Sequence, residues 1–194
     1  MLLLRRPRGA RHGADACEER WRHSVLLFEQ MRAKHEFGQE IAQGQVDGTR
    51  AKIEGQEMSE RTFVMVKPDG VKKGLTEEIV GRIERAGLRI VSMRQVNMDR
   101  AKAERLYAVH RGKDFFERLV DHVLSGPVVV MLVEGDRAIS RMRELVGATD
   151  PAKAVKGTIR GDYGSSITEN VIHAADSTKS AEHEMPIFFP NAKG

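Results

Sequence analysis

The chain has 194 residues, of which 40% are hydrophobic and 31% are charged, and its formal net charge is +4. This mild charge suits a protein that handles anionic small molecules, but it is too dispersed to indicate nucleic-acid binding. The single Cys17 excludes an intrachain disulfide framework, and no apolar run is long enough to cross a membrane. We therefore expect a globular protein of the cytoplasm with no membrane association.

The first 57 residues differ in composition from the rest of the chain. They contain the only tryptophan, Trp21, and an arginine-rich start that fits neither a secretory signal nor an acid-poor mitochondrial targeting peptide. A rough apolar stripe predicts a helix over 16–36, and 37–57 is typical of a linker or a disordered segment. We expect residues 1–57 to be an extension that is dispensable or not part of the native protein, with 58–194 as the functional domain.

The first predicted strand, 62–66, is apolar and β-branched, as in a buried strand. It ends at Lys67, because Pro68 has no N–H to donate and Asp69-Gly70 is turn chemistry. A lysine at the end of a strand lies where α/β folds collect groups that bind a ligand. Lys67 is therefore a candidate site residue, and the alternative is an ordinary exposed lysine.

Apolar residues at helical spacing predict a helix over 76–86, which Gly87 ends, and a second strand follows over 88–96. Asp99 is expected to cap the next helix, over 100–108.

Asp114 and Glu117 match a capping box, which predicts that another helix opens there. The run 128–133 is continuously apolar, as in a central strand that is covered on both faces. Asp136 is then expected to cap a helix over 137–146.

The stretch 148–168 predicts a long loop rich in glycine and charge, followed by a short strand over 170–173. A last helix over about 177–184 is expected to close the domain before Pro186. Leaving aside the helices between the second and third strands, the order is βαββαβ. It predicts a ferredoxin-like α+β fold, with a four-stranded antiparallel sheet, helices on one face and a long loop at the ligand site. This fold by itself implies no function.

His173 lies in the short last strand. A strand would place it on the same side as Val171, and the small Ala174 and Ala175 leave open space beside its ring. Three glycines upstream let the loop backbone approach a ligand: Gly157, Gly161 and Gly164. With Arg160 nearby, these features suit histidine-mediated phosphoryl transfer, although a structural histidine and a surface arginine are the plainer alternative.

Other residues of suitable chemistry lie at strand ends, helix starts and loops, the usual places for ligand groups. Phosphate oxygens prefer lysine and arginine forks, an exposed aromatic ring stacks on a base, and a carboxylate can hold one nitrogen of a nucleophilic imidazole. The candidates are Lys67, Tyr107, Phe115, Arg143, Thr149, Arg160, Asn170, His173 and Glu184.

Plainer interpretations exist for several of these. Phe115 fits a core position, and Arg143 fits the solvated face of its helix. Three other histidines compete for the nucleophile role, but each lies in a helical or charged stretch and is expected at the surface: His110, His122 and His183. Residues 58–194 have neither paired histidines at metal-ligand spacing nor a P-loop, so we expect no metal site built from side chains.

Four blocks of sequence carry a more specific signal: VKPDGV at 66–71, SGPVV at 125–129, GTIRGD at 157–162 and NVIHA at 170–174. They resemble the signature blocks of nucleoside diphosphate kinases, in the order and at the spacing of that family. The resemblance covers residues 58–194 and none of 1–57.

The resemblance implies a ping-pong kinase in which the γ-phosphoryl group of a nucleoside triphosphate such as ATP passes to a histidine and then to a nucleoside diphosphate, which maintains nucleotide pools. His173 matches the phosphohistidine of the family, and Tyr107 and Glu184 match groups that orient it and the γ-phosphate. Phe115 and Leu119 match the base-stacking region. The phosphate- and sugar-contacting positions match Lys67, Arg143, Thr149, Arg160 and Asn170.

The resemblance also implies Mg²⁺ carried on the nucleotide phosphates, broad tolerance of the base, and a homo-oligomer. The short segment after 188–190 leaves tetramer and hexamer open. One departure concerns Ala175, where the family commonly has serine, so a hydroxyl near the histidine is missing. Alternatives are a nucleotide- or nucleic-acid-binding protein without activity and a purely structural oligomer, but each would be expected to lack the nucleophile or a phosphate-binding residue.

Overall fold

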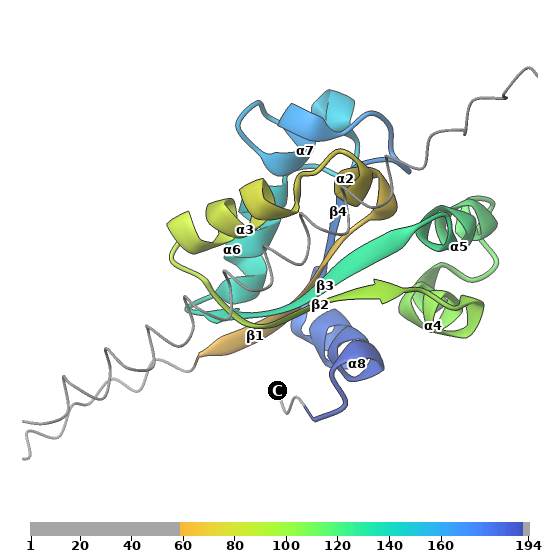
Figure 1. The fold of residues 1–194 in the computed structure, drawn as a ribbon, viewed down its shortest axis with the longest axis horizontal. Helices are drawn as coiled ribbons and strands as arrows, with labels where there is room; N and C mark the ends of the chain where they lie inside the picture. The colour runs from red at the N-terminus through yellow and green to blue at the C-terminus, as the bar shows by residue number, and fades with distance from the viewer. Residues whose placement is uncertain (1–58, 192–194) are drawn as a thin grey trace, which may run out of the picture. The chain divides into compact units, whose positions relative to one another are not determined.

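The protein is described by a computed structural model that covers residues 59–191. The expectations for residues 1–57 lie outside the described residues. The strands are β1 (Glu60–Val66), β2 (Arg89–Asn97), β3 (Pro127–Gly135) and β4 (Ile172–Ala174) (Figure 1). The helices are α2 (Pro68–Lys72), α3 (Thr76–Arg85), α4 (Arg100–Leu106), η1 (Ala108–His110), α5 (Phe116–Leu124), α6 (Ala138–Val146), η2 (Pro151–Lys153), α7 (Ile159–Tyr163) and α8 (Thr178–Phe188). None of the described helices is long and apolar enough to cross a membrane.

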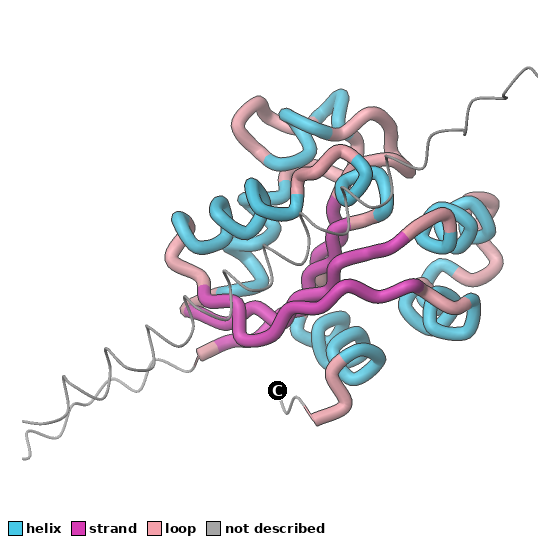
Figure 2. Tube along the Cα trace, viewed as in Figure 1, coloured by secondary structure: helices cyan, strands magenta, loops and turns pink. Residues whose placement is uncertain are grey.

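The four strands form one antiparallel sheet in the order β2-β3-β1-β4, so the predicted ferredoxin-like arrangement is confirmed (Figure 2). β1 and β3 are central, and their apolar runs are buried, as the sequence predicted. β4 begins at Ile172 rather than at residue 170. The reason is that Val171 has a left-handed φ of 61°, which breaks the extended chain, so Val171 and His173 do not share a strand face.

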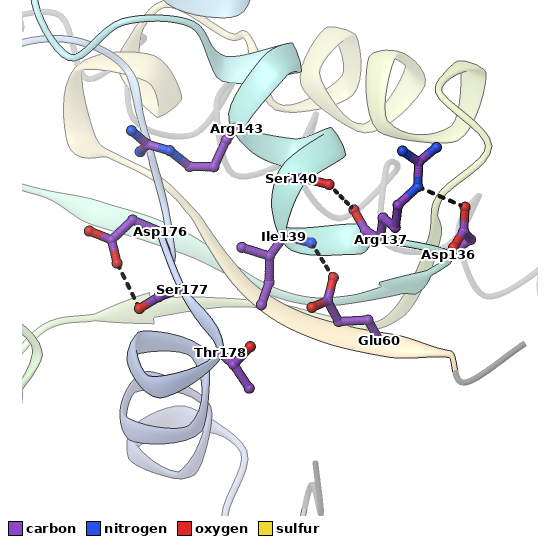
Figure 3. Close-up of a pocket in the computed structure, with 9 residues that line it drawn as sticks. All are labelled: Glu60, Asp136, Arg137, Ile139, Ser140, Arg143, Asp176, Ser177 and Thr178. Carbon is purple, nitrogen blue, oxygen red and sulfur yellow. Dashed lines mark hydrogen bonds and ion pairs between the residues drawn. The ribbon is translucent and has the colours of Figure 1, made fainter.

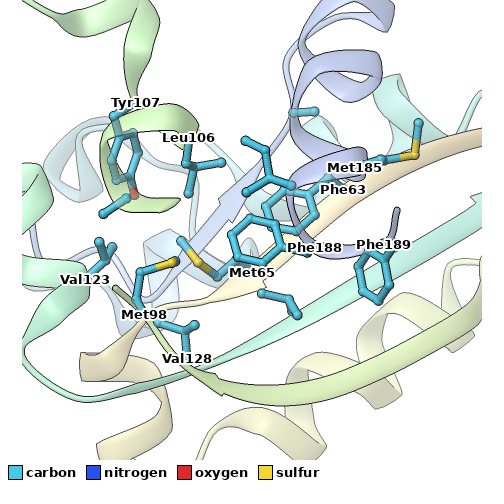
Figure 4. Packing of buried hydrophobic residues seen from close by; sticks show 14 of the residues in the cluster. Phe63, Met65, Met98, Leu106, Tyr107, Val123, Val128, Met185, Phe188 and Phe189 are labelled. Atoms are coloured by element: carbon cyan, nitrogen blue, oxygen red, sulfur yellow. The ribbon is translucent and has the colours of Figure 1, made fainter. Parts of the chain in front are cut away.

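Helices cover both faces of the sheet. α3 and α6 lie on one face, as expected for the βαββαβ order, whereas α8 lies on the other face with α4 and α5 beside it (Figure 1). The expectation of helices on one face only is therefore wrong. Phe63 and Met65 of β1 point to the α8 face and join its apolar cluster (Figure 4), in which the rings of Phe63 and Phe188 stack with centroids 4.8 Å apart.

Two of the predicted helix ends are confirmed. Gly87, with φ 72°, follows α3, and its N–H donates to Glu84 while the next N–H, of Leu88, donates to Ile83. Asp99 caps α4, because its carboxylate accepts from the backbone N–H of Lys102 at 2.8 Å.

Two other predicted caps are wrong. α5 begins at Phe116 without a side-chain cap, so Asp114 does not cap it. At α6, the backbone N–H of Ile139 donates to Glu60 of β1 at 2.8 Å, and Asp136 contacts Arg137 instead. The cap of α6 comes from a strand far away in the sequence, so local pattern gave no signal for it.

Helical structure extends further than the sequence predicted. Pro68 opens the short helix α2 as its first residue, and the 148–168 loop contains η2 and α7. α8 continues through Pro186 to Phe188, so it does not end before the proline. Proline removes one helical N–H, but burial of Ile187 and Phe188 favours a continued helix at its last turn.

Phe188→Ala is expected to lower the free energy of unfolding by about 3–5 kcal/mol, because it removes a fully buried ring that stacks on Phe63. Urea unfolding followed by circular dichroism measures this change. Lys179→Ala, at an exposed position of α8, is the control and should change stability by about 0.5 kcal/mol or less. A loss below about 1 kcal/mol for Phe188→Ala would contradict this account of the core.

Candidate active site

A cavity of about 880 Å³ opens between the end of β1, the α4–α5 region, the 148–168 loop, β4 and α8. Every candidate residue from the sequence lines it: Lys67, Tyr107, Phe115, Leu119, Arg143, Thr149, Arg160, Asn170, His173 and Glu184. These residues span more than 110 positions of sequence, so the fold brings the whole set together at one place.

His173 stands on β4 opposite Met65 of β1, which places its ring on the α8 face of the sheet. Its Nε2 lies 2.8 Å from Oε2 of Glu184 on α8. An ionised carboxylate only accepts hydrogen bonds, so this contact places the ring proton on Nε2. Nδ1 then carries the lone pair, and no described residue makes a hydrogen bond to it. The geometry suits a neutral histidine that acts as a nucleophile through Nδ1.

Tyr107 packs against the histidine from the end of α4. Its ring meets that of His173 edge to face, at 5.9 Å between centroids and 87° between planes. Its hydroxyl is buried and has no hydrogen-bond partner among the described residues. Burial, with the charge of Glu184 adding to it, raises the pKa of Tyr107 above its usual value, so the hydroxyl stays protonated and can donate to a ligand.

Lys67 leaves the end of β1 and is only 4% exposed. Its Nζ donates to Oδ1 of Asn170 at 2.7 Å and to the backbone oxygen of Thr168 at 3.2 Å. The amide of Asn170 in turn donates to the backbone oxygens of Thr149 and Ile167, both at 2.9 Å. Burial, together with the nearby charge of Arg160, lowers the pKa of Lys67 to about 8. Lys67 thus retains its charge at neutral pH in a position that favours an anion.

Arg160, on α7, brings a second buried cation to the same place. Its guanidinium donates to the backbone oxygens of Gly147 at 3.2 Å and of Ile172 at 3.0 Å. Its Nε is buried and has no partner among the described residues. Burial, and then the charge of Arg143, lowers the pKa of Arg160 to about 10. Arg143 and Lys67 thus lie with Arg160 in a site where buried positive charge is unfavourable and where a bound anion would be stabilising.

Aromatic rings line the outer part of the cavity. The ring of Phe115 is 37% exposed, so it is not a core residue, and it meets His110 at 5.4 Å between centroids. His110 also stacks on Tyr107 at 6.4 Å. Leu119, one turn further along α5, is partly buried beside them. An exposed ring on a supported platform suits stacking on a flat base.

Sequence reasoning missed several residues near this site. His110 lines the cavity and His122 pairs with Asp69 at 3.1 Å, so neither is a plain surface histidine as expected, whereas His183 lies exposed. Arg118 also lines the cavity; its place three residues after Phe115 on one helix was a signal in the sequence. The pairing of His122 with Asp69 joins two helices that are distant in sequence, so no local pattern indicated it.

The prediction that the three loop glycines make room for a ligand is wrong for two of them, Gly161 and Gly164, where the absent Cβ makes room for other loop residues. A Cβ at Gly164 would lie 2.6 Å from Cγ of Pro151, and one at Gly161 would meet the backbone oxygen of Val155. These glycines let the loop pack on itself. Gly157, at φ 95°, has open space beside it and needs glycine for its backbone conformation.

A second, shallower depression of about 670 Å³ lies next to the cavity, between the starts of α6 and α8 (Figure 3). Arg143 and Asp176 line both spaces, and in Figure 3 the Arg143 side chain extends away from Glu60 and Ile139. A hydrogen bond from Ser180, opposed by partial burial, lowers the pKa of Asp176. Among the described residues no group of three side chains is placed to hold a metal ion.

Burial of the Lys67 charge predicts a pH-dependent stability. Between pH 8, the lowered pKa, and pH 10.5, the ordinary value, the unfolded state binds a proton that the folded state has lost, so raising pH favours folding. Relative to Lys67→Met, the wild-type protein should gain up to about 3 kcal/mol over this interval. Urea unfolding of both proteins at several pH values measures the difference, and a constant difference would contradict the account.

Comparison with known proteins identifies the family of this chain. The family model described as nucleoside diphosphate kinase matches residues 60–193. The chain is 56% identical over 130 residues to the nucleoside diphosphate kinase of Sulfolobus acidocaldarius, covering 67% of this chain and 90% of that protein. It is 56% identical over 132 residues to that of Saccharolobus solfataricus, covering 68% of this chain and 96% of that protein.

Solved structures give the same result. A halophilic nucleoside diphosphate kinase from Halobacterium salinarum, in complex with CDP, superimposes with a TM-score of 0.67 at 46% identity, covering 69% of this chain and 89% of that one. The Aquifex aeolicus nucleoside diphosphate kinase gives a TM-score of 0.66 at 39% identity over 68% of this chain and 95% of that one. This chain therefore belongs to the nucleoside diphosphate kinase family, enzymes that transfer phosphate from a nucleoside triphosphate to a nucleoside diphosphate.

Proposed function

We propose that the transfer proceeds in two steps through Nδ1 of His173. Nδ1 attacks the γ-phosphorus of a nucleoside triphosphate such as ATP, an N–P bond forms, and the bond to the β-γ bridging oxygen breaks to release a diphosphate. A terminal phosphate oxygen of a second nucleoside diphosphate then attacks the phosphorus of the phosphohistidine, an O–P bond forms, and the N–P bond breaks, which releases a nucleoside triphosphate and returns His173 to its starting state. The observation that carries this proposal is the 2.8 Å contact between Nε2 of His173 and Glu184, which leaves Nδ1 without a hydrogen bond to the described residues, in a ring that lines the cavity.

The three cations are proposed to hold the phosphates and disperse the charge of the transition state. Lys67, Arg143 and Arg160 line the cavity with His173, and the lowered pKa values of Lys67 and Arg160 indicate a site short of negative charge. Fixed cations that need no rearrangement at the moment of reaction stabilise such a transition state well. Thr149 and Asn170 are assigned to sugar and phosphate contacts, and Tyr107 to orienting the histidine and the γ-phosphate.

Phe115 and Leu119 are proposed to bind the base by stacking. The exposed ring of Phe115 and its apolar neighbour provide a flat surface. Stacking accepts every base, because each has a π face. We therefore expect the enzyme to use purine and pyrimidine nucleotides alike.

Kinases of this family generally use a divalent metal, and we propose that it is Mg²⁺ here. The described residues that line the cavity include three carboxylates, Asp150, Asp176 and Glu184, and Glu184 is engaged by His173. The two that remain fit a Mg²⁺ that enters on the nucleotide phosphates, with at most one or two protein ligands. When bound, the ion neutralises phosphate charge during the transfer.

We further propose a homo-oligomer, a tetramer or a hexamer, in the cytoplasm. β2 is an edge strand of the sheet, and Val155 is a largely exposed apolar residue on the 148–168 loop. Unpaired edges and exposed apolar side chains favour association. We also propose that the catalytic domain begins near residue 58 and comprises residues 58–194.

Incubation of the full chain with γ-labelled ATP, without an acceptor, is expected to place one acid-labile phosphoryl group on His173. Because Glu184 holds Nε2, the label should be 1-phosphohistidine, the Nδ1 isomer, which isomer-specific antibodies or ³¹P NMR distinguish from 3-phosphohistidine. Adding a nucleoside diphosphate should remove it. His173→Gln is the matched control and should take no label while it still binds ADP. Nucleotide binding by the wild-type protein with no label would contradict the proposal.

Ala175→Ser is expected to raise the single-turnover rate of phosphorylation by roughly 5-fold, the value of about one hydrogen bond. Ala175 lies buried in the same apolar cluster as Tyr107, whose buried hydroxyl lacks a partner among the described residues. A serine at position 175 would restore the hydroxyl that nucleoside diphosphate kinases commonly have there. Rapid-quench measurements give the rate, and an unchanged rate would show that the missing hydroxyl is of no consequence.

A further inference from the structure

Asp69 follows Lys67 by two residues, and the proposed reaction assigns it no part. It lies on α2 with a side chain that is 10% exposed, and each of its two oxygens has a partner. Oδ1 lies 3.1 Å from Nε2 of His122 on α5, and Oδ2 accepts the backbone N–H of Val171 at 3.0 Å. Asp69 thus joins α5 to the corner that precedes β4.

That corner is held in a conformation that its residue does not favour. Val171 is β-branched, yet its φ is 61°, in the left-handed region. Its N–H is held by Asp69, and its carbonyl accepts the backbone N–H of Lys67 at 2.9 Å. Its side chain is fully buried. A strained backbone of this kind persists only where its surroundings fix it from several sides, and here three contacts do so.

Gly70 contributes to the same arrangement. A Cβ at Gly70 would lie 2.7 Å from the backbone oxygen of Val171 and 2.8 Å from Cγ1 of Val66. Only glycine lets α2 approach the corner closely enough for Asp69 to reach the Val171 amide. The Asp-Gly pair is therefore more than a turn that ends β1.

Val171 separates two residues of the site. Asn170, immediately before it, bonds the Lys67 ammonium at 2.7 Å, and His173, two residues later, bonds Glu184 at 2.8 Å. The left-handed step at Val171 sets the relative direction of these two side chains, both of which line the cavity. A small rotation of this peptide would move the histidine relative to the phosphate-binding groups.

We infer that Asp69 is a positioning residue for the phosphoryl transfer: it holds the Val171 amide, and His122 holds the Asp69 carboxylate in place. The inference rests on the proposed role of His173. Burial opposes ionisation of Asp69, but the hydrogen bonds and charge of His122 and the Val171 N–H lower its pKa below the usual value, so it accepts both hydrogen bonds at neutral pH.

The first test compares Asp69→Ala with Asp69→Asn in the full chain, measuring the single-turnover rate of His173 phosphorylation by ATP and the Kd for ADP. Asp69→Ala loses the acceptor for Val171 and should slow phosphorylation by about 10- to 100-fold, as expected for a small misplacement of a reacting group. Its Kd for ADP should change by less than about 3-fold, since it leaves the phosphate-binding side chains in place. Asp69→Asn keeps an oxygen that can accept and an amide that can donate to His122, so its rate should stay within about 3-fold of wild type.

Glu134→Ala is the matched control. Glu134 is also a shielded, ion-paired carboxylate, bonded to Arg61 and Arg89, but it lies at the opposite end of β3 from the site. Its loss should lower the melting temperature and leave the phosphorylation rate unchanged. If Asp69→Ala and Glu134→Ala changed the phosphorylation rate equally, Asp69 would contribute only to stability, and the inference would be overturned.

A second readout does not depend on activity. Amide hydrogen exchange at Val171, compared with that of Met65 on β1, should rise at least about 10-fold in Asp69→Ala and remain unchanged in Asp69→Asn and Glu134→Ala. If wild type takes no label from ATP, the proposed function fails and the positioning role fails with it, and exchange at Val171 then tests only whether Asp69 holds the Val171 amide. Unchanged exchange at Val171 overturns the inference. Should Asp69→Ala not fold, Asp69→Ser replaces it, because its shorter side chain also fails to reach the amide.

Discussion

β1 pairs with β3 along one edge and with the three residues of β4 along the other, and both of its faces are buried. The short pairing with β4 sets His173 opposite Met65, on the face that α8 covers, where Glu184 meets it. The same strand ends at Lys67, whose backbone N–H holds Val171 and whose side chain holds Asn170. Strand pairing thus determines the face of the sheet on which His173, the proposed nucleophile, lies. A shift of β4 by one residue would turn His173 to the opposite face.

The site concentrates positive charge where water is scarce. Lys67 and Arg160 are both buried, and burial lowers the pKa of each, with the charge of Arg160 adding to the effect at Lys67 and the charge of Arg143 adding to it at Arg160. Without an anion this arrangement opposes folding, since a buried charge without full compensation is unfavourable. A bound polyphosphate would reverse the sign of that interaction. The stability that β1, β3 and the apolar cluster around Phe63 provide is what allows the protein to hold such a site in the absence of ligand.

Much of the fold followed from local pattern. The four strands, the two helices of the βαββαβ order and the caps at Gly87 and Asp99 were predicted, because hydrophobic period and cap chemistry are local properties. The expectations that were wrong depended on distant partners. Glu60 rather than Asp136 satisfies the start of α6, and core packing carries α8 past Pro186.

Sequence by itself determined which residues make up the candidate site and which family the chain belongs to, because residue types in ordered motifs are written along the chain. All ten candidate residues line one cavity. Only the tertiary structure decided which nitrogen of His173 is held, how far the pKa values of Lys67 and Arg160 fall, and that Asp69 and His122 fix the corner at Val171. Those properties depend on how closely segments as much as a hundred residues apart approach one another and on how deeply they are buried. The order of residues along the chain states neither the distances nor the burial.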